Sequence, residues 1–137
     1  MLTDAAGVPL GVAIAGANVH DQKLVTETLR SVPVRRPQPT PRKRQHLCAD
    51  KGYDANAVRR VANRRRYIAH IPRKGEASST PRRRTGKARR WVVERTHSWT
   101  NRARRLLIRW EKKAANYLGF VHLQFAITAL RAAGVLG

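Results

Sequence analysis

Two of the eight acidic residues in this 137-residue sequence stand where a metal-binding carboxylate would be expected. The first, Asp50, ends the short apolar run Leu47–Ala49 and is followed at once by Lys51 and Gly52. This pattern predicts a buried strand that ends at Asp50, and ligand sites in open α/β sheets gather at the carboxyl ends of strands. The alternative is an acid that only caps the strand end.

The second candidate, Glu94, lies in a segment whose apolar residues repeat with a helical period. At about 100° per residue it is rotated by roughly 200° from Val92, which places it off the core-facing stripe. Arg90, Asn101 and Arg105 fall within about 40° of it on the same predicted surface. Such a site suits phosphate chemistry, because the acid holds Mg²⁺ and the arginines hold the strand. The alternative is an exposed salt bridge from Glu94 to Arg90.

The other six acids have simpler explanations in the sequence. Three are predicted to stabilise turns or cap helices, because Asp is a preferred residue at both places. The others lie in a helix, in a polar stretch and beside two lysines. These six residues are Asp4, Asp21 and Asp54, and then Glu27, Glu76 and Glu111.

Composition narrows the class of partner. A net charge of +21, from 29 basic and 8 acidic residues, indicates a polyanion, most simply DNA or RNA; an acidic membrane surface is the alternative. The single cysteine, Cys48, excludes a disulfide framework and is predicted to be a buried thiol. The apolar C-terminal stretch is interrupted by His122, Gln124 and Arg131, so no membrane span is predicted. We expect a cytoplasmic, DNA-associated protein.

The first half of the chain alternates apolar runs with helical patterns. A proline-rich, basic loop interrupts it, and Pro72 ends the last apolar run. The expected elements are a turn at 4–7, a central strand at 8–17, a helix at 22–31 capped by Asp21, a loop at 33–44, a strand at 45–49, a helix at 55–66 capped by Asp54 and a strand at 67–71.

The second half is expected to be helical after a flexible basic arm at 73–87. A helix at 88–111 would bury an apolar stripe that contains Trp99 and Trp110, while Trp91 is left open. A last helix at 113–133 would bury Phe120, Leu123, Ile127 and Leu130. This order of strands and helices predicts one α/β domain.

Four motifs, in this order, resemble bacterial insertion-sequence transposases of the DDE class, and most closely the group numbered five. They are Thr3–Leu10, Ala17–Asp21, Ala49–Asp54 and Arg90–Thr96, the last continued by Trp99 and Arg104–Leu106. The resemblance covers nearly the whole chain. It implies a ribonuclease-H-like fold, in which a mixed sheet carries two Asp residues and a following helix carries a Glu. It also implies Mg²⁺- or Mn²⁺-dependent cleavage and transfer of DNA strands at insertion-sequence ends, with the metal ion expected only where the acidic triad is complete.

By this resemblance Asp50 is the second acid of the triad and Glu94 is the third. The first Asp is expected on a strand before the segment that resembles Thr3–Leu10, so the chain resembles a partial domain without its first strand. We therefore expect the chain alone to be inactive. We also expect it to be poorly stable, because the strand from Val8 would expose an apolar edge.

The resemblance also predicts the DNA contacts. In the family's Tyr-Arg-Glu-Lys pattern, Arg90 and Glu94 match, whereas Lys87 and Asn101 stand at the Tyr and Lys positions. Arg102 or Arg105 would replace the missing lysine. The predicted contacts are Lys51, Arg82, Arg83, Arg84, Arg90, Arg95, Arg102, Arg104, Arg105 and Arg109.

The expected partners are the terminal inverted repeats and the target DNA, together with an upstream transposase fragment or a second copy of the chain. The alternative function is a basic DNA-binding accessory without chemistry. A basic structural protein that resembles a ribosomal component is disfavoured by the acidic motifs around Asp50 and Glu94.

Overall fold

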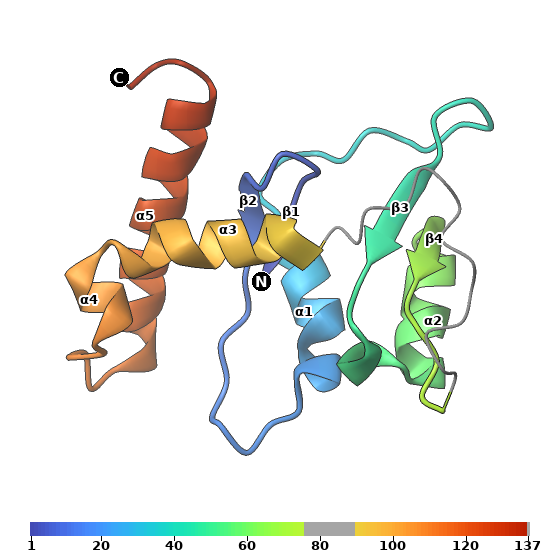
Figure 1. Ribbon diagram of the computed structural model, residues 1–137, viewed down its shortest axis with the longest axis horizontal. Helices are drawn as coiled ribbons and strands as arrows, with labels where there is room; N and C mark the ends of the chain where they lie inside the picture. The colour runs from blue at the N-terminus through green and yellow to red at the C-terminus, as the bar shows by residue number, and fades with distance from the viewer. Residues whose placement is uncertain (76–89, 137) are drawn as a thin grey trace.

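The computed structural model of the chain describes residues 1–75 and 90–136 (Figure 1). Most of the predicted basic arm, including Arg82, Arg83 and Arg84, lies outside the described residues. The elements, in chain order, are β1 (Leu2–Thr3), β2 (Pro9–Gly11), the 3-10 helix η1 (Asp21–Leu24), α1 (Val25–Arg30), β3 (Gln45–Cys48), the 3-10 helix η2 (Lys51–Tyr53), α2 (Asn56–Arg64), β4 (Tyr67–His70), α3 (Arg90–Asn101), α4 (Arg104–Leu107) and α5 (Ala114–Ala132). This is an α/β architecture, as predicted.

The N-terminal strands β1 and β2 form an antiparallel hairpin. Its turn is stabilised by Asp4, whose Oδ1 accepts hydrogen bonds of 2.8 Å from the backbone N–H groups of Ala6 and Val8. Gly7 completes the turn with a φ of +85°, a conformation that glycine adopts at little cost. The predicted turn at 4–7 is confirmed.

The predicted strand at 8–17 is wrong beyond Gly11. The N–H of Val12 donates to the Oγ of Ser31 at 2.8 Å, so a side chain at the end of α1 replaces the next strand partner. Gly11 allows this close approach, because a Cβ there would lie 2.7 Å from the Ser31 Oγ and 2.9 Å from the Thr28 carbonyl oxygen.

Strands β3 and β4 pair in parallel, and α2 is the crossover between them. Residues 33–44, all of them described, form neither helix nor strand, in line with the predicted loop. One face of the strand pair is covered by α2 and α1, and the opposite face carries His46, Cys48 and His70, all exposed. The core between these elements consists of Val25, Leu29, Leu47, Val58, Ala62 and Ile71.

Three predictions about single residues in this part are wrong. Cys48 is exposed, because strand alternation points the neighbouring Leu47 into the core instead. Neither Asp21 nor Asp54 caps a helix, since η1 and α2 have His20 and Ala55 at their N-cap positions, without a side-chain cap bond. Asp54 instead accepts hydrogen bonds from Arg59 and from the backbone N–H of Lys74, each at 2.7 Å.

The described strands form two separate two-stranded sheets, one antiparallel and one parallel. Helix α3 lies across the hairpin and packs against β1, while α5 packs against β2 and α3 (Figure 1). Within the described residues no further strand joins the two sheets into the predicted mixed sheet.

The predicted helix at 88–111 is interrupted after Asn101. Ala103 has an extended backbone (φ −80°, ψ 106°), and α4 then runs for four residues. The interruption shifts the helical phase, so the predicted apolar stripe does not form. Trp99 is half-buried and Trp110 is exposed, so the predicted burial of Trp110 is wrong.

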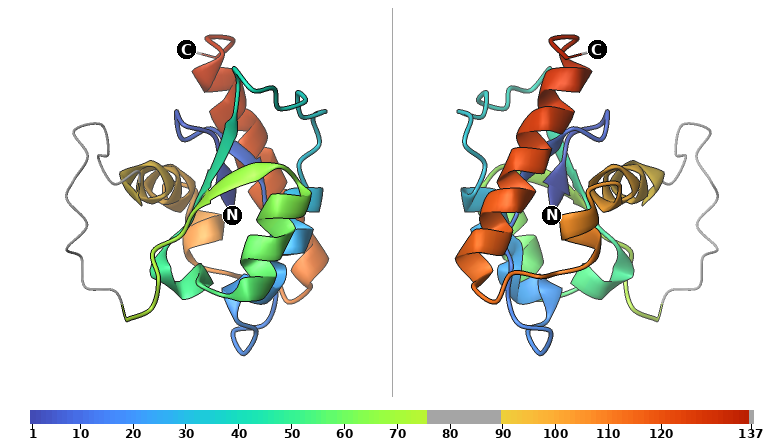
Figure 2. Two further views of the ribbon diagram at one scale, coloured as in Figure 1. Left: turned by 90° about the vertical axis from the view of Figure 1, so that its right-hand side faces the viewer. Right: turned by 90° about the vertical axis from the view of Figure 1, so that its left-hand side faces the viewer.

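Helix α5 covers the predicted C-terminal helix and runs along one side of the molecule (Figure 2). Its buried residues are Val121, Phe125 and Thr128, whereas Leu123 and Leu130 of the predicted stripe are 57% and 41% exposed. The predicted face is therefore wrong at Leu123 and Leu130, whereas Phe120 and Ile127 are half-buried. No helix among the described residues is long and apolar enough to cross a membrane.

Candidate active site

Asp50 stands two residues beyond the last residue of β3, at its carboxyl end, as predicted. Its Oδ1 accepts a 2.9 Å hydrogen bond from the backbone N–H of Gly52, and this bond caps η2. The residue is nevertheless exposed. The carboxylate of Asp50 therefore caps η2 and is still accessible to solvent, because the hydrogen bond from Gly52 orients the side chain without burying it.

A second acid lies near this strand end. The 3-10 helices η1 and η2 pack against each other, and the phenol of Tyr53 is half-buried there. Its burial raises the pKa of Tyr53 above the ordinary value, and the nearby charges of Asp21 and Asp50 raise it further. The sequence had assigned Asp21 only to helix capping, and nothing in its spacing from Asp50 indicates that the two approach the same phenol.

Glu94 is exposed on α3, opposite the buried face formed by Val92, Thr96 and Thr100. Its predicted position off the core is confirmed. The predicted arginine beside it is wrong for Arg105, because the chain leaves the helix after Asn101 and Arg105 belongs to α4.

The helix that carries Glu94 is anchored to the N-terminal hairpin. The Thr96 hydroxyl is fully buried, donates to the Gly7 carbonyl at 2.6 Å and lies 3.1 Å from the Val92 carbonyl. The guanidinium of Arg95 donates to the carbonyl of Ala6 and lies 4.9 Å from the ring centroid of Trp99. These contacts fix the position of α3, and so of Glu94, relative to the hairpin. Arg95 thus has a structural role, and its predicted contact with DNA stays a prediction.

The two carboxylates suit a hard divalent cation. Oxygen ligands are what Mg²⁺ prefers, and it is commonly held by one or two carboxylates plus water and substrate phosphates. Within residues 1–75 and 90–136, no group of three or more His, Cys, Asp or Glu side chains is placed to hold a metal ion. The described part of the chain therefore offers two exposed carboxylates rather than a closed cage.

Exposed cations lie next to Asp50 and in the segment that follows α3. Lys51 follows Asp50 directly, and Arg102, Arg104, Arg105 and Arg109 are exposed along α4 and its flanks. The side chain of Arg90 lies outside the described side chains. Lys51 and these four arginines are accessible to solvent, and their contact with DNA stays a prediction.

The comparison with known proteins identifies the class to which these features belong. Residues 1–129 match the family described as the transposase DDE domain. The chain belongs to this family. It is also 36% identical, over 125 residues, to the putative transposase for insertion sequence element IS402 of Burkholderia cepacia. That alignment covers 90% of this chain and 57% of the relative, so the chain spans a little over half the length of that transposase. No solved structure matches the chain.

The predicted resemblance to a bacterial insertion-sequence DDE transposase is thus confirmed. The family is one of transposases, which are DNA-transferring enzymes that generally use divalent metal ions.

Proposed function

We propose that this chain supplies the second and third carboxylates, Asp50 and Glu94, of an insertion-sequence transposase that cleaves and transfers DNA strands. The observation that carries the proposal is the exposure of both acids in a DDE-family chain, one at the end of β3 and one on α3. Because the chain spans 57% of its relative's length, the activity of the whole protein and its terminal inverted repeats are part of the proposal.

Each group of the proposed site has a separate role. A divalent ion, Mg²⁺ or Mn²⁺, supplies activation of the attacking oxygen and stabilisation of the leaving oxygen when it is bound. The Gly52 N–H, 2.9 Å from Oδ1, holds the carboxylate of Asp50 at the strand end. The Thr96 bond to the hairpin holds the helix that presents Glu94. The cations of α4 hold the phosphates of the bound strand.

The first acid of the triad and a ribonuclease-H-like sheet complete this proposal. The segment that resembles Thr3–Leu10 follows the first acid in the family, and no acid of this sequence takes that place. A polypeptide that precedes this segment, or a partner chain, would supply the acid and the strand that carries it. That strand would also join the separate sheets of the described fold.

The test is Mg²⁺-dependent cleavage of DNA that carries terminal inverted repeats. We expect no cleavage by the chain alone, and cleavage by a fusion in which the upstream part of the related transposase precedes it. In the fusion, Asp50→Asn and Glu94→Gln should each lower the rate by more than about 100-fold, since even groups that only orient metal ligands contribute 10–100-fold. The matched control, Glu27→Gln, changes an exposed acid on α1 and should leave the rate unchanged.

Two results would contradict the proposal. Robust cleavage by the chain alone would show that it needs no further acid. Cleavage that survives Asp50→Asn in the fusion would show that this residue is not a metal ligand.

A second function is favoured by the net charge of +21. A chain of this charge binds DNA without chemistry and would act as an accessory or competitor of a complete transposase. DNA binding that is insensitive to Asp50→Asn, together with an inactive fusion, would favour this function over the first.

A further inference from the structure

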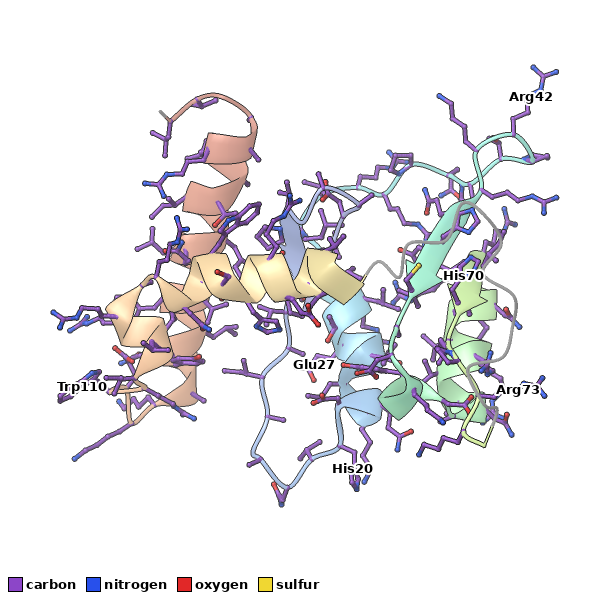
Figure 3. The ribbon with its side chains drawn as sticks, in the orientation of Figure 1. His20, Glu27, Arg42, His70, Arg73 and Trp110 are labelled. Carbon is purple, nitrogen blue, oxygen red and sulfur yellow. The ribbon has the colours of Figure 1, made fainter. Side chains whose placement is uncertain are left out.

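The turn between α4 and α5 exposes three large apolar side chains. Leu107, Ile108 and Trp110 are 60%, 58% and 74% exposed. The backbone explains this, because α4 ends at Leu107 and Ile108 is extended, with φ −116° and ψ 108°. Figure 3 shows Trp110 at the outer end of the turn, pointing away from the body of the molecule. Neighbouring apolar side chains held in solvent indicate a contact surface.

The charges around this turn indicate the kind of partner. Its single acid, Glu111, has a side chain that is only 8% exposed and an Oε1 that lies 4.0 Å from the Nε of Arg105. The negative charge is therefore withdrawn from the surface, and the exposed charge is positive. Protein–protein interfaces are depleted in lysine and acidic residues but enriched in arginine, whereas a cluster of lysines and arginines without an exposed acid is typical of nucleic-acid surfaces. The six cations of the segment are Arg102, Arg104, Arg105, Arg109, Lys112 and Lys113.

Side chains of helix α5 contact the arginines of the turn. The guanidinium of Arg105 lies 4.8 Å from the ring centroid of Phe120, and that of Arg109 lies 5.3 Å from that of Tyr117. The Nε of Arg109 also donates to the carbonyl of Glu111 at 3.2 Å. These contacts keep the turn extended, so the indole is presented to solvent beside fixed positive charges.

An exposed indole favours DNA with unpaired bases over an intact duplex. Bases inside a duplex have both faces covered by their neighbours, whereas an unpaired base offers a free face for stacking. We propose that Trp110 stacks on an unpaired nucleobase while the cations of the turn hold the flanking phosphates. The choice of DNA as partner rests on the proposed function, but the stacking requires neither Asp50 nor a metal ion.

The test is DNA binding by the full chain in EDTA, measured by fluorescence anisotropy. The probes are a labelled single strand, its duplex and the same duplex with a short unpaired overhang. Trp110→Ala should weaken binding to the single strand and the overhang by roughly five- to 150-fold, which is the loss of one base–aromatic stack. Binding to the blunt duplex should change by less than about twofold, because phosphate contacts dominate there.

Two further variants separate ring stacking from apolar bulk. Trp110→Phe keeps an aromatic face and should retain most of the preference for unpaired bases. Trp110→Leu keeps only bulk and should lose it. Val135→Ala is the matched control, because it removes a 66% exposed apolar side chain outside this turn, and it should bind like the wild type.

Several outcomes would overturn the inference. They are binding of every probe by Trp110→Ala with the affinity of the wild type, a Trp110→Leu variant that binds like Trp110→Phe, and a change of oligomeric state in sedimentation with DNA binding intact. The last result would identify a protein-binding surface. If Trp110→Ala does not fold by circular dichroism, the comparison of Phe with Leu decides. Loss of the proposed function, seen as cleavage that does not depend on Asp50, would leave the stacking result standing, whereas a wild-type chain that binds no DNA would overturn the stacking inference alone.

Discussion

Replacing Thr96 by valine tests the link between the helix that carries Glu94 and the N-terminal hairpin. Thr96 has no exposed surface, and its hydroxyl donates to the Gly7 carbonyl at 2.6 Å. Valine keeps the shape of the side chain but removes this donor, and Gly7 is itself buried. A buried carbonyl without a partner costs about 1–3 kcal/mol, whereas the helix propensities of Thr and Val are similar. We expect Thr96→Val to lower the free energy of unfolding by about 1–3 kcal/mol.

Urea unfolding followed by circular dichroism measures this change. Thr96→Ser is the matched control, because it keeps the hydroxyl and loses one methyl group, worth about 1 kcal/mol. Hydrogen exchange adds a local readout: the amides of Gly7 and Val8 should exchange faster in Thr96→Val than in Thr96→Ser. A valine variant within about 0.5 kcal/mol of the wild type, with unchanged exchange in the hairpin, would refute the reasoning.

Three further predictions concern other contacts of the described fold. Gly7→Ala should destabilise the chain by about 1–2 kcal/mol in urea unfolding, because φ is +85° at this position and L-residues rarely adopt it; an unchanged midpoint would contradict this. Gly11→Ala should lower the free energy of unfolding by about 1–3 kcal/mol, because the new Cβ would lie 2.7 Å from the Ser31 Oγ. Adding Ser31→Ala should recover part of this loss, and a double variant no more stable than Gly11→Ala would show that the hydroxyl is not the obstacle. The hydrogen bond from Arg59 lowers the pKa of the Asp54 carboxyl below its usual value of 3.8, so its stabilising effect is present above that pH and is lost as the pH falls through the lowered pKa. The difference in thermal midpoint between the wild type and Asp54→Asn should therefore shrink below pH 4, and a difference that stays constant from pH 2 to 6 would argue against this ion pair.

The parts of the fold that the sequence predicts well are bounded by strong local signals. Pro72 stands two residues after the end of β4, and the apolar run before Asp50 marks β3. The interruption after Asn101 has no such signal, because neither Gly nor Pro occurs between α3 and α4. It depends on long-range packing against α5, which a helical period does not contain. The same break explains why the burial of Trp110 was predicted wrongly.

In the candidate site, too, local features were predictable and contacts between distant elements were not. The exposure of Asp50 and Glu94 follows from their local places, at a strand end and off a helix stripe. The approach of Asp21 to the phenol of Tyr53 does not, because it depends on how η1 packs against η2, two elements far apart in the sequence. The buried face of α5 could not be predicted from the sequence either, because this helix is apolar over much of its circumference and several faces fit the pattern equally well.

The most direct test of the central claim is Mn²⁺-induced broadening of backbone amide signals in NMR spectra of the fusion in which the upstream part of the related transposase precedes this chain. If Asp50 and Glu94 hold the same ion, the amides beside both residues should broaden together at one Mn²⁺ concentration. Mg²⁺ should reverse this broadening, and Asp50→Asn should abolish it at both places. Mg²⁺ prefers oxygen ligands, so its competition separates this site from the neighbouring pair His46 and His70, whose Nδ1 and Nε2 atoms lie 2.7 Å apart. Broadening beside only one of the two acids, or broadening at Glu94 that persists in Asp50→Asn, would contradict the account.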